Sequence, residues 1–280
     1  MATANRFLLA GVMGWPIMHS RSPTLHNYWF NRYGLKGTYV PLAIAPERLE
    51  AALRALAPLG FAGCNLTIPH KERALAVLDE VDDTARRMGA VSCVTVRSDG
   101  TLRGTNNDAY GFIQNLLQHH PGWRADAGAA TVIGAGGGAR AIVYALAERG
   151  SPEIRLLNRT RERADALARE IGPPVTSLDW SQREEALEGV ALLVNTTNQG
   201  MVGQSPLELA LDRLPRSALV SDIVYVPLET PLLTDARRRG NPTCDGLGML
   251  LHQARPAWQA WFGLEPTVTP ELRAALEATL

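Results

Sequence analysis

Apolar runs of strand length alternate with segments of helical period along most of the chain. In the first part, apolar runs near residues 6–13, 38–44 and 61–67 predict strands. Between them, apolar residues recur every three or four positions, which predicts helices at 23–33 and 46–57. Because strands and helices take turns along the chain, we expect this part to form an α/β domain.

The pattern shortens after residue 67 and then changes to that of a hairpin. Two short helical stretches are expected at 70–78 and 82–88. The segments 91–97 and 101–104 are separated by Ser98-Asp99-Gly100, a sequence that favours a tight turn. We therefore expect two antiparallel strands here.

The second half of the chain alternates more regularly, and a helix from Asp108 to His120 leads into it. Regular alternation of this kind implies a parallel sheet with right-handed crossovers. The expected strands lie at 130–134, 153–158, 190–195 and 218–224, and the expected helices at 138–149, 161–171 and 230–239. We therefore expect a doubly wound parallel sheet.

An apolar helical stretch runs from Leu247 to Phe262, interrupted by Pro256, and a last helix is expected at 270–279. We expect these C-terminal helices to pack back on the first domain. The expected organisation is an α/β domain at 1–107, a Rossmann-type domain at 108–244 and the returning helices at 245–280.

A glycine turn directly follows the expected strand at 130–134. Gly134 permits a tight turn, Gly136 lets the backbone approach a pyrophosphate, and Ala139 lets the next helix pack closely. This arrangement is typical of a dinucleotide-binding site, although a glycine turn also occurs in ordinary α/β proteins. The candidate cofactor residues are Gly134, Ala135, Gly136, Gly137, Gly138 and Ala139.

The end of the next expected strand indicates which dinucleotide binds. NAD enzymes usually place an acidic residue there, which accepts hydrogen bonds from the ribose hydroxyls. This chain has Asn158, followed by Arg159 and Thr160, with Arg163 one turn into the next helix. Two guanidinium groups and a hydroxyl can surround a 2′-phosphate. We therefore expect NADP as the cofactor.

Charge and cysteine content narrow the class of partner. Lys plus Arg and Asp plus Glu number 28 each among 280 residues, so the formal net charge is zero. A neutral chain lacks the electrostatic footprint of nucleic-acid or anionic-membrane binding, and no apolar run approaches membrane-spanning length. We expect a small-molecule substrate, and a monomer or homodimer. Three widely spaced cysteines, Cys64, Cys93 and Cys244, indicate reduced thiols in a cytoplasmic protein.

A dehydrogenase needs a group that exchanges the alcohol proton as the hydride moves. Lys71, in the segment 65–72, is expected near a helix start because Pro69 suits a first helical turn. The helix dipole disfavours an ammonium there and a nearby carboxylate favours it, which poises a lysine for proton transfer. A solvated lysine beside Glu72 is the alternative reading, and His70 is a second candidate proton carrier.

Further polar groups lie where a substrate is expected. Asp108 precedes the helix into the second domain, so we expect it to bind a substrate hydroxyl and hold Lys71, or else to cap that helix. Ser20 and Ser22 project to the same side of an extended segment, and Pro23 opens a helix whose backbone donors suit a carboxylate. Ser22 also fits the position of a plain helix cap.

No metal site is expected. His19, His26 and His70 lie on separate segments without the spacing of metal ligands, and no paired carboxylate motif accompanies them.

Taken together, these segments resemble the shikimate dehydrogenase family. The resemblance rests on Ser20-Arg21-Ser22-Pro23, residues 65–72, Asn106 with Asp108, Gly134–Ala139, Asn158-Arg159-Thr160 and residues 245–250, in that order. It spans roughly residues 8–263. The resemblance implies a two-domain enzyme that reduces 3-dehydroshikimate to shikimate with NADPH, in the biosynthesis of aromatic amino acids.

The resemblance also implies roles for particular residues. Lys71 and Asp108 would form the catalytic pair, and Ser20 and Ser22 would hold the substrate carboxylate. Further substrate-binding residues would be Thr67, Ser92, Tyr225 and Gln253, and further cofactor-binding residues would be Thr196, Gly246 and Met249.

Two departures from the family pattern bear on the substrate. The family usually has Gly-Ala-Val-Asn-Thr where this chain has Gly89-Ala90-Val91-Ser92-Cys93, and Asn-Thr-Asp where it has Asn106-Asn107-Asp108. Ser92 cannot both donate and accept over the reach of an amide, and losing one substrate hydrogen bond costs about 1–3 kcal/mol. A quinate or other polyol-acid dehydrogenase is therefore the first alternative. A non-catalytic NADP-binding sensor is the second.

Overall fold

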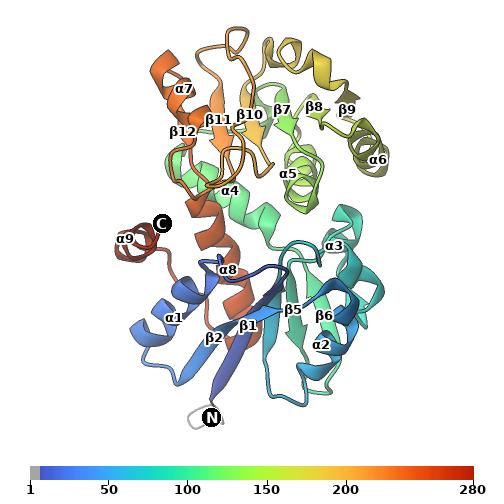
Figure 1. The fold of residues 1–280 in the computed structure, drawn as a ribbon, viewed down its shortest axis with the longest axis vertical. Helices are drawn as coiled ribbons and strands as arrows, with labels where there is room; N and C mark the ends of the chain where they lie inside the picture. The colour runs from blue at the N-terminus through green and yellow to red at the C-terminus, as the bar shows by residue number, and fades with distance from the viewer. Residues whose placement is uncertain (1–6) are drawn as a thin grey trace. The chain divides into compact units, whose positions relative to one another are not determined.

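The computed structural model describes residues 7–280, so residue 6, where we expected the first strand to begin, lies outside it (Figure 1). The chain divides into two compact units. Unit 1 consists of residues 7–107 together with Gln253–Thr279, and unit 2 consists of Asp108–His252 together with Leu280. Each unit contains one six-stranded sheet.

Unit 1 has a mixed sheet. Its strands are β1 (Leu8–Gly14), β2 (Gly37–Ala43), β3 (Gly63–Leu66), β4 (Glu80–Val81), β5 (Cys93–Val96) and β6 (Leu102–Thr105). They lie in the order β2-β1-β3-β5-β6-β4. β1 is parallel to β2 and β3, whereas β5 is antiparallel to β3 and β6. The expected hairpin is therefore present, and the two-residue strand β4 is an addition to the expected elements.

The helices of unit 1 follow the expected pattern except after β3. They are α1 (Ser22–Arg32), η1 (Pro46–Arg48), α2 (Leu49–Ala55), η2 (Arg73–Ala76), α3 (Asp83–Met88) and α9 (Pro270–Glu277). α3 begins where the Asp82 carboxylate accepts from the Ala85 N–H over 2.7 Å, and it ends at Gly89 with a φ of +67°. The short helical stretch expected at 70–78 forms only in part, as the 3₁₀ helix η2.

α8 (Leu247–Phe262) begins in unit 2 and its longer part, from Gln253, belongs to unit 1. This part packs on α1 and the sheet through aromatic side chains. Trp258 lies 5.6 Å from Trp29 between ring centroids and donates from Nε1 to Nδ1 of His26 over 2.6 Å. Trp261 donates from Nε1 to the carbonyl of Val94 over 2.9 Å. The C-terminal helices therefore return to the first domain, as expected.

Unit 2 has an all-parallel sheet. Its strands are β7 (Ala130–Ile133), β8 (Ile154–Leu157), β9 (Val175–Leu178), β10 (Leu192–Asn195), β11 (Leu219–Asp222) and β12 (Thr243–Cys244). Their order is β12-β11-β10-β7-β8-β9. If β7 is counted as the first strand and the sheet is followed from β9 to β12, the strand order is 3-2-1-4-5-6. This is the strand order of a Rossmann fold. The predicted doubly wound parallel sheet is confirmed, and the edge strands β9 and β12 are additions to the expected elements.

Helices connect the strands of unit 2. They are α4 (Asp108–His119), η3 (Ala125–Ala127), α5 (Gly137–Glu148), α6 (Arg161–Ile171), η4 (Trp180–Gln182), η5 (Glu185–Leu187) and α7 (Pro231–Arg239). Within residues 7–280, none of the helices combines the length and the apolar character that a bilayer crossing requires.

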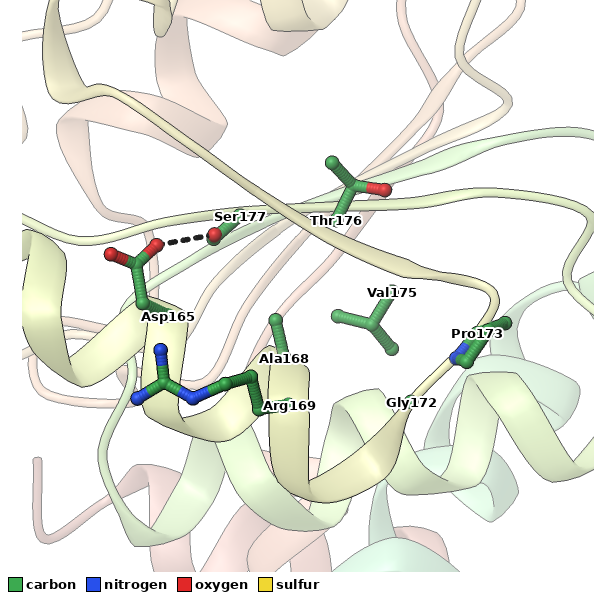
Figure 2. Close-up of a pocket in the computed structure, with 8 residues that line it drawn as sticks. All are labelled: Asp165, Ala168, Arg169, Gly172, Pro173, Val175, Thr176 and Ser177. Atoms are coloured by element: carbon green, nitrogen blue, oxygen red, sulfur yellow. Dashed lines mark hydrogen bonds between the residues drawn. The ribbon is translucent and has the colours of Figure 1, made fainter.

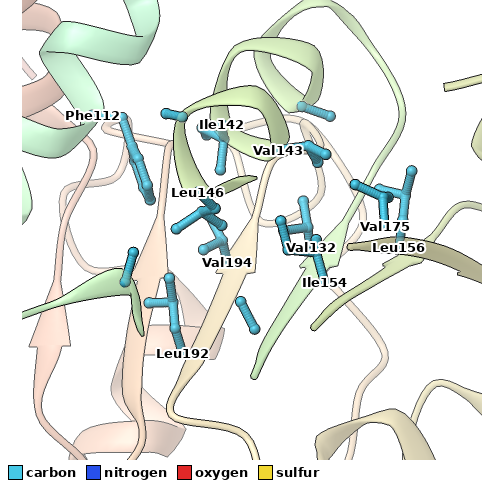
Figure 3. Close-up of a cluster of buried hydrophobic side chains, with 14 of the residues drawn as sticks. Phe112, Val132, Ile142, Val143, Leu146, Ile154, Leu156, Val175, Leu192 and Val194 are labelled. Carbon is cyan, nitrogen blue, oxygen red and sulfur yellow. The ribbon is translucent and has the colours of Figure 1, made fainter. Parts of the chain in front are cut away.

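The core of unit 2 explains its apolar strands. Figure 3 shows Val132 of β7, Leu156 of β8 and Val194 of β10 on one face of the sheet, beneath Ile142 and Leu146 of α5. All five are completely buried. Burying a side chain of this size contributes about 1.5–3 kcal/mol. The core thus fixes β7 and α5, and with them the turn between the two.

Candidate active site

Strand ends gather at one edge of the unit 1 sheet. Met13 of β1 lies opposite Leu66 of β3, Asn65 lies opposite Cys93 of β5, and Cys93 lies opposite Thr105 of β6. Because β5 is antiparallel to its neighbours, its start lies at the same edge as the ends of β1, β3 and β6. The predicted residues on segments that leave this edge are Ser20, Ser22, Thr67, Lys71 and Ser92.

The segments that follow β1 and β3 lie directly against each other. A Cβ at Gly14 would come within 2.6 Å of Cγ2 of Thr67, so only glycine fits there. The N–H of Trp15 also donates to the carbonyl of Ile68 over 3.1 Å. These contacts bring the loop that carries Ser20 beside the turn that carries Thr67.

Ser20 and Ser22 lie close together at the start of α1, and the convergence of their hydroxyl groups stays a prediction. The N–H of Ser22 donates to Oγ of Ser20 over 3.3 Å. Ser22 is the first residue of α1, and the cap position before it belongs to Arg21, whose side chain makes no cap bond. The alternative interpretation of Ser22 as the helix cap is therefore wrong. The Ser22 side chain instead bonds to Tyr39.

A chain of buried hydrogen bonds continues from Ser22 across the sheet. The hydroxyl of Tyr39 donates to Oδ1 of Asn65 over 2.8 Å, and Nδ2 of Asn65 donates to the carbonyl of Ser92 over 3.2 Å. Burial raises the pKa of Tyr39, with a smaller contribution from the Cys64 thiol. The sequence analysis gave no role to Tyr39 or to the Asn65 side chain, because no local motif connects them to the serines.

Ser92 is almost wholly buried, with 2% of its surface exposed. Its hydroxyl accepts from the N–H of Asn107 over 2.9 Å and donates to Oδ1 of Asn106 over 3.4 Å. The single hydroxyl proton of Ser92 is therefore already directed to a protein acceptor.

Lys71 lies in a turn and is half-buried. The turn follows Thr67, whose carbonyl accepts from the N–H of His70 over 2.8 Å, and the carbonyl of Lys71 accepts from Val91. Our expectation that a helix dipole acts on Lys71 is therefore wrong, since no α-helix begins there. His70 is fully buried with Nε2 at 2.9 Å from the Ile44 carbonyl, and burial lowers its pKa. Its burial argues against the alternative of His70 as proton carrier.

The glycine turn of unit 2 is closed by Thr196. Gly134 has a φ of +113°, and a Cβ there would lie 2.4 Å from Oγ1 of Thr196. The N–H and Oγ1 of Thr196 both donate to the Ile133 carbonyl, over 2.8 and 2.7 Å. A Cβ at Gly136 would meet no atom within 4 Å, and Ala139 is completely buried. The turn thus offers open backbone at the start of α5.

This turn lies at the switch point of the unit 2 sheet. β7 and β10 are neighbours, and the strand order runs in opposite directions on either side of them. Dinucleotides bind at such points, with the pyrophosphate at the helix N-terminus. The predicted residues Ala135, Gly137 and Gly138 occupy the same turn and the first residues of α5.

Arg159 and Arg163 are exposed at the end of β8 and the start of α6. Within residues 7–280, neither guanidinium forms an ion pair or a hydrogen bond. Arg161 differs from both, because it pairs with Asp179 at 3.3 Å. Nδ2 of Asn158 donates to the Thr160 carbonyl over 2.8 Å, which holds the segment that carries Arg159. Two cationic groups here are therefore available to an anion.

Asp222, at the end of β11, is a buried carboxylate that the sequence analysis missed. It accepts from Nδ2 of Asn195, from the N–H of Val224 and from Oγ1 of Thr230, over 3.0, 3.0 and 2.8 Å. Burial raises its pKa from 3.8 to about 6, against the effect of these hydrogen bonds. The sequence contains a signal for this residue, because Asp222 is an acidic residue directly at the end of an apolar strand.

The remaining predicted residues of unit 2 lie after β11 and β12 or at the start of α4. A Cβ at Gly246 would come within 2.3 Å of the Ile223 carbonyl, and Met249 packs with Ile223 against the core. Tyr225 is half-buried in the loop after β11. Asp108 is the first residue of α4 and is buried.

The predicted catalytic pair is divided between the units, since Lys71 belongs to unit 1 and Asp108 to unit 2. Gln253, with 8% of its surface exposed, is the first residue of the part of α8 that belongs to unit 1. The roles assigned to these three residues stay predictions.

Comparison with known proteins gives the family. A family described as shikimate dehydrogenase substrate binding domain matches residues 12–94, and one described as shikimate / quinate 5-dehydrogenase matches residues 118–227. A protein named shikimate dehydrogenase (NADP(+)) from Paramagnetospirillum magneticum is 59% identical over 266 residues, which cover 95% of this chain and 96% of that protein. The chain belongs to the shikimate dehydrogenase family.

Solved structures share the fold of this shikimate dehydrogenase family member over nearly its whole length. A shikimate 5-dehydrogenase from Thermus thermophilus, in complex with NADP(H) and shikimate, is 36% identical with a TM-score of 0.86 and covers 98% of this chain and 100% of its own. A quinate dehydrogenase from Corynebacterium glutamicum, in complex with NAD, is 31% identical with a TM-score of 0.89 and covers 97% and 99%.

A surface hollow of about 460 Å³ in this shikimate dehydrogenase family member lies between α6 and β9 (Figure 2). Figure 2 shows Ser177 of β9 directed to Asp165 of α6, and the hydroxyl donates to the carboxylate over 2.5 Å. None of the predicted site residues lines this hollow. It is therefore separate from both groups of predicted residues.

Proposed function

We propose that the chain catalyses the reversible NADP-dependent reduction of 3-dehydroshikimate to shikimate. The observation that carries this proposal is the 59% identity, over 95% of the chain, to a protein named shikimate dehydrogenase (NADP(+)). The two structural units support it, because one has a dinucleotide turn and the other gathers polar side chains at one sheet edge.

Unit 2 is the NADP-binding part in this proposal. The open backbone at Gly136 receives the pyrophosphate at the start of α5, and the unpaired guanidinium groups of Arg159 and Arg163 hold the 2′-phosphate. Thr196 lines the turn, while Gly246 and Met249 lie toward the nicotinamide. When bound, NADPH supplies the hydride.

Unit 1 is the substrate-binding part. Ser20 and Ser22 hold the substrate carboxylate, and this role is supported by the Ser20 hydroxyl, which lies at the backbone N–H of Ser22 at the start of α1. The remaining substrate contacts come from Thr67, Ser92, Tyr225 and Gln253, of which Tyr225 belongs to unit 2.

Lys71 and Asp108 carry the proton. As hydride reaches the ring ketone, the carbonyl oxygen gains negative charge, and the Lys71 ammonium donates a proton to it to form the alcohol. Asp108 binds the substrate hydroxyl and orients Lys71. In oxidation, the same pair removes the proton.

We also propose that the protein works in the cytoplasm with reduced cysteines. We propose further that it is a monomer or a homodimer. The structure contains Cys64, Cys93 and Cys244 as free, buried thiols. Within the described residues, no group of three or more His, Cys, Asp or Glu side chains gathers that could hold a metal ion.

Quinate oxidation is the second candidate. This candidate is supported by the similarity in fold to the quinate dehydrogenase from Corynebacterium glutamicum, which has a TM-score of 0.89. That protein was solved with NAD, whereas the two unpaired arginines of this chain favour a 2′-phosphate.

The test is a panel of shikimate and quinate, each with NADP⁺ and with NAD⁺, followed at the nicotinamide absorbance band. Shikimate with NADP⁺ is expected to give the highest kcat/KM. Faster turnover of quinate would replace the proposed substrate. Cofactor binding without turnover of any cyclic polyol acid would instead support the non-catalytic sensor.

A further inference from the structure

The carboxamide of Asn107 is a buried polar group without a hydrogen-bond partner for its donor. Only 8% of Asn107 is exposed, and Nδ2 has no acceptor among the residues that the structure describes. Buried side-chain polar atoms are nearly always hydrogen-bonded in native proteins, so an exception calls for an explanation. A bound ligand that supplies the missing acceptor is one such explanation.

Asn107 lies at the sheet edge where the substrate is proposed to bind. It follows β6, and its own N–H donates to Oγ of Ser92 over 2.9 Å. Ser92 is connected through Asn65 and Tyr39 to Ser22 by the buried hydrogen bonds described above. The backbone that carries the unpartnered amide is therefore joined to the same network as a proposed substrate-carboxylate residue.

Ser92 cannot supply the donor at this place. Its only hydroxyl proton is directed to Oδ1 of Asn106 over 3.4 Å, and Nδ2 of Asn106 donates to the Ala90 carbonyl over 2.8 Å. In this cluster, among the described residues, the Nδ2 group of Asn107 is the amide donor without an acceptor. Positions 92 and 107 are also among the three, with position 93, at which the chain departs from the family pattern in these two segments.

We propose that Asn107 is a specificity-determining residue whose Nδ2 donates a hydrogen bond to a non-reacting ring hydroxyl of the cyclic polyol acid. Besides its own proposed contact to the substrate, Ser92 positions Asn107, because the bond from the Asn107 N–H fixes the backbone that carries the amide. This inference rests on the proposed function. The amide that the family pattern has at position 92 is supplied here from position 107.

The test compares wild type with Asn107→Thr on shikimate and on two analogues, each of which lacks one of the two non-reacting ring hydroxyls. On shikimate, Asn107→Thr is expected to lower kcat/KM ten- to a hundredfold, the loss typical of one buried hydrogen bond, without changing the KM for NADP⁺. On the analogue that lacks the contacted hydroxyl, the two proteins are expected to have equal kcat/KM.

Asn107→Asp serves as the second variant, because it keeps the shape of the side chain and removes the donor. Thermal unfolding of both variants checks the fold. An equal loss on all three compounds indicates a merely structural role and overturns the inference, as does unchanged kcat/KM on shikimate. A wild-type protein that turns over none of the compounds overturns the proposed function itself, and the inference with it.

Discussion

Nε1 of Trp258, on α8, donates a hydrogen bond over 2.6 Å to Nδ1 of His26, on α1. His26 is completely buried, which lowers its pKa from 6.5 to about 3. Between these values the unfolded chain binds a proton that the folded chain does not, so stability falls as the pH is lowered. From pH 7 to pH 4.5, His26 is expected to remove about 2.5 kcal/mol from the free energy of unfolding.

Urea unfolding of wild type and His26→Gln at both pH values measures this contribution. Between pH 7 and pH 4.5, wild type is expected to lose about 2.5 kcal/mol more unfolding free energy than His26→Gln. His19→Gln is the matched control, because His19 is exposed. A difference between wild type and His26→Gln that is independent of pH would contradict a neutral, buried His26.

Asp222 is expected to act in the opposite direction. Burial raises its pKa from 3.8 to about 6, so its contribution to stability is present below pH 3.8 and is lost as the pH rises through 6. Relative to Asp222→Asn, which stays neutral, wild type is expected to lose about 2 kcal/mol of unfolding free energy between pH 4 and pH 7. Urea unfolding at the two pH values measures it. An increase over this range would show that the hydrogen bonds outweigh burial.

Gly134 and Gly136 form a matched pair of glycine positions. Gly134→Ala places a methyl group 2.4 Å from Oγ1 of Thr196 at a φ of +113°, so it is expected to cost about 1–3 kcal/mol of stability. Gly136→Ala meets no protein atom within 4 Å and is expected to leave stability unchanged. It is nevertheless expected to weaken NADP⁺ binding, because the methyl group occupies the proposed approach of the pyrophosphate. Thermal unfolding and NADP⁺ titration separate the two effects.

Arg159→Ala and Arg163→Ala are each expected to weaken NADP⁺ binding about tenfold or more and to leave NAD⁺ binding nearly unchanged. A hydrogen bond to a charged group contributes about 1.5–3 kcal/mol, and only NADP⁺ carries the 2′-phosphate. Arg161→Ala is the control, because its guanidinium already pairs with Asp179 at 3.3 Å. Equal losses for both cofactors would place the arginines elsewhere than at the 2′-phosphate.

Lys71→Ala is expected to lower kcat at least a hundredfold, the usual contribution of a general acid or base, without changing the dissociation constant of NADP⁺. Lys36→Ala, which removes the exposed lysine at the start of β2, is the control. Steady-state kinetics and cofactor titration give the two quantities. A parallel loss of turnover and cofactor affinity would contradict the proposed role of Lys71 in proton transfer.

The cofactor turn could be predicted because its residue types are consecutive and each meets a local backbone requirement. The positive φ of Gly134 and the complete burial of Ala139 are examples. Long helices such as α4 and α5 were predicted to within a few residues, since their apolar period extends over three turns. The edge strands β9 and β12 have too few apolar positions to be recognised.

The substrate edge could be predicted only in part. Ser20 and Ser22 are neighbours in sequence, so their proximity followed from local spacing. The contact between Ser92 and Asn107 depends on the antiparallel register of β5 and β6, and the contact between Tyr39 and Asn65 joins segments 26 residues apart. At Lys71, the polar segment after Pro69 suggested a helix, whereas hydrogen bonds to neighbouring segments hold it in a turn.

Unit 1 is built from two segments that are far apart in the chain, residues 7–107 and Gln253–Thr279. This affects the order in which the protein can fold during synthesis on the ribosome. Unit 2, apart from Leu280, is the stretch Asp108–His252, which has been synthesised while residues 253–279 are still being added. Until Trp258 and Trp261 emerge, Trp29, His26 and the Val94 carbonyl lack the side chains that cover them. The part of the protein made first is therefore the last to reach its native packing, and during that interval its aromatic surface stays uncovered.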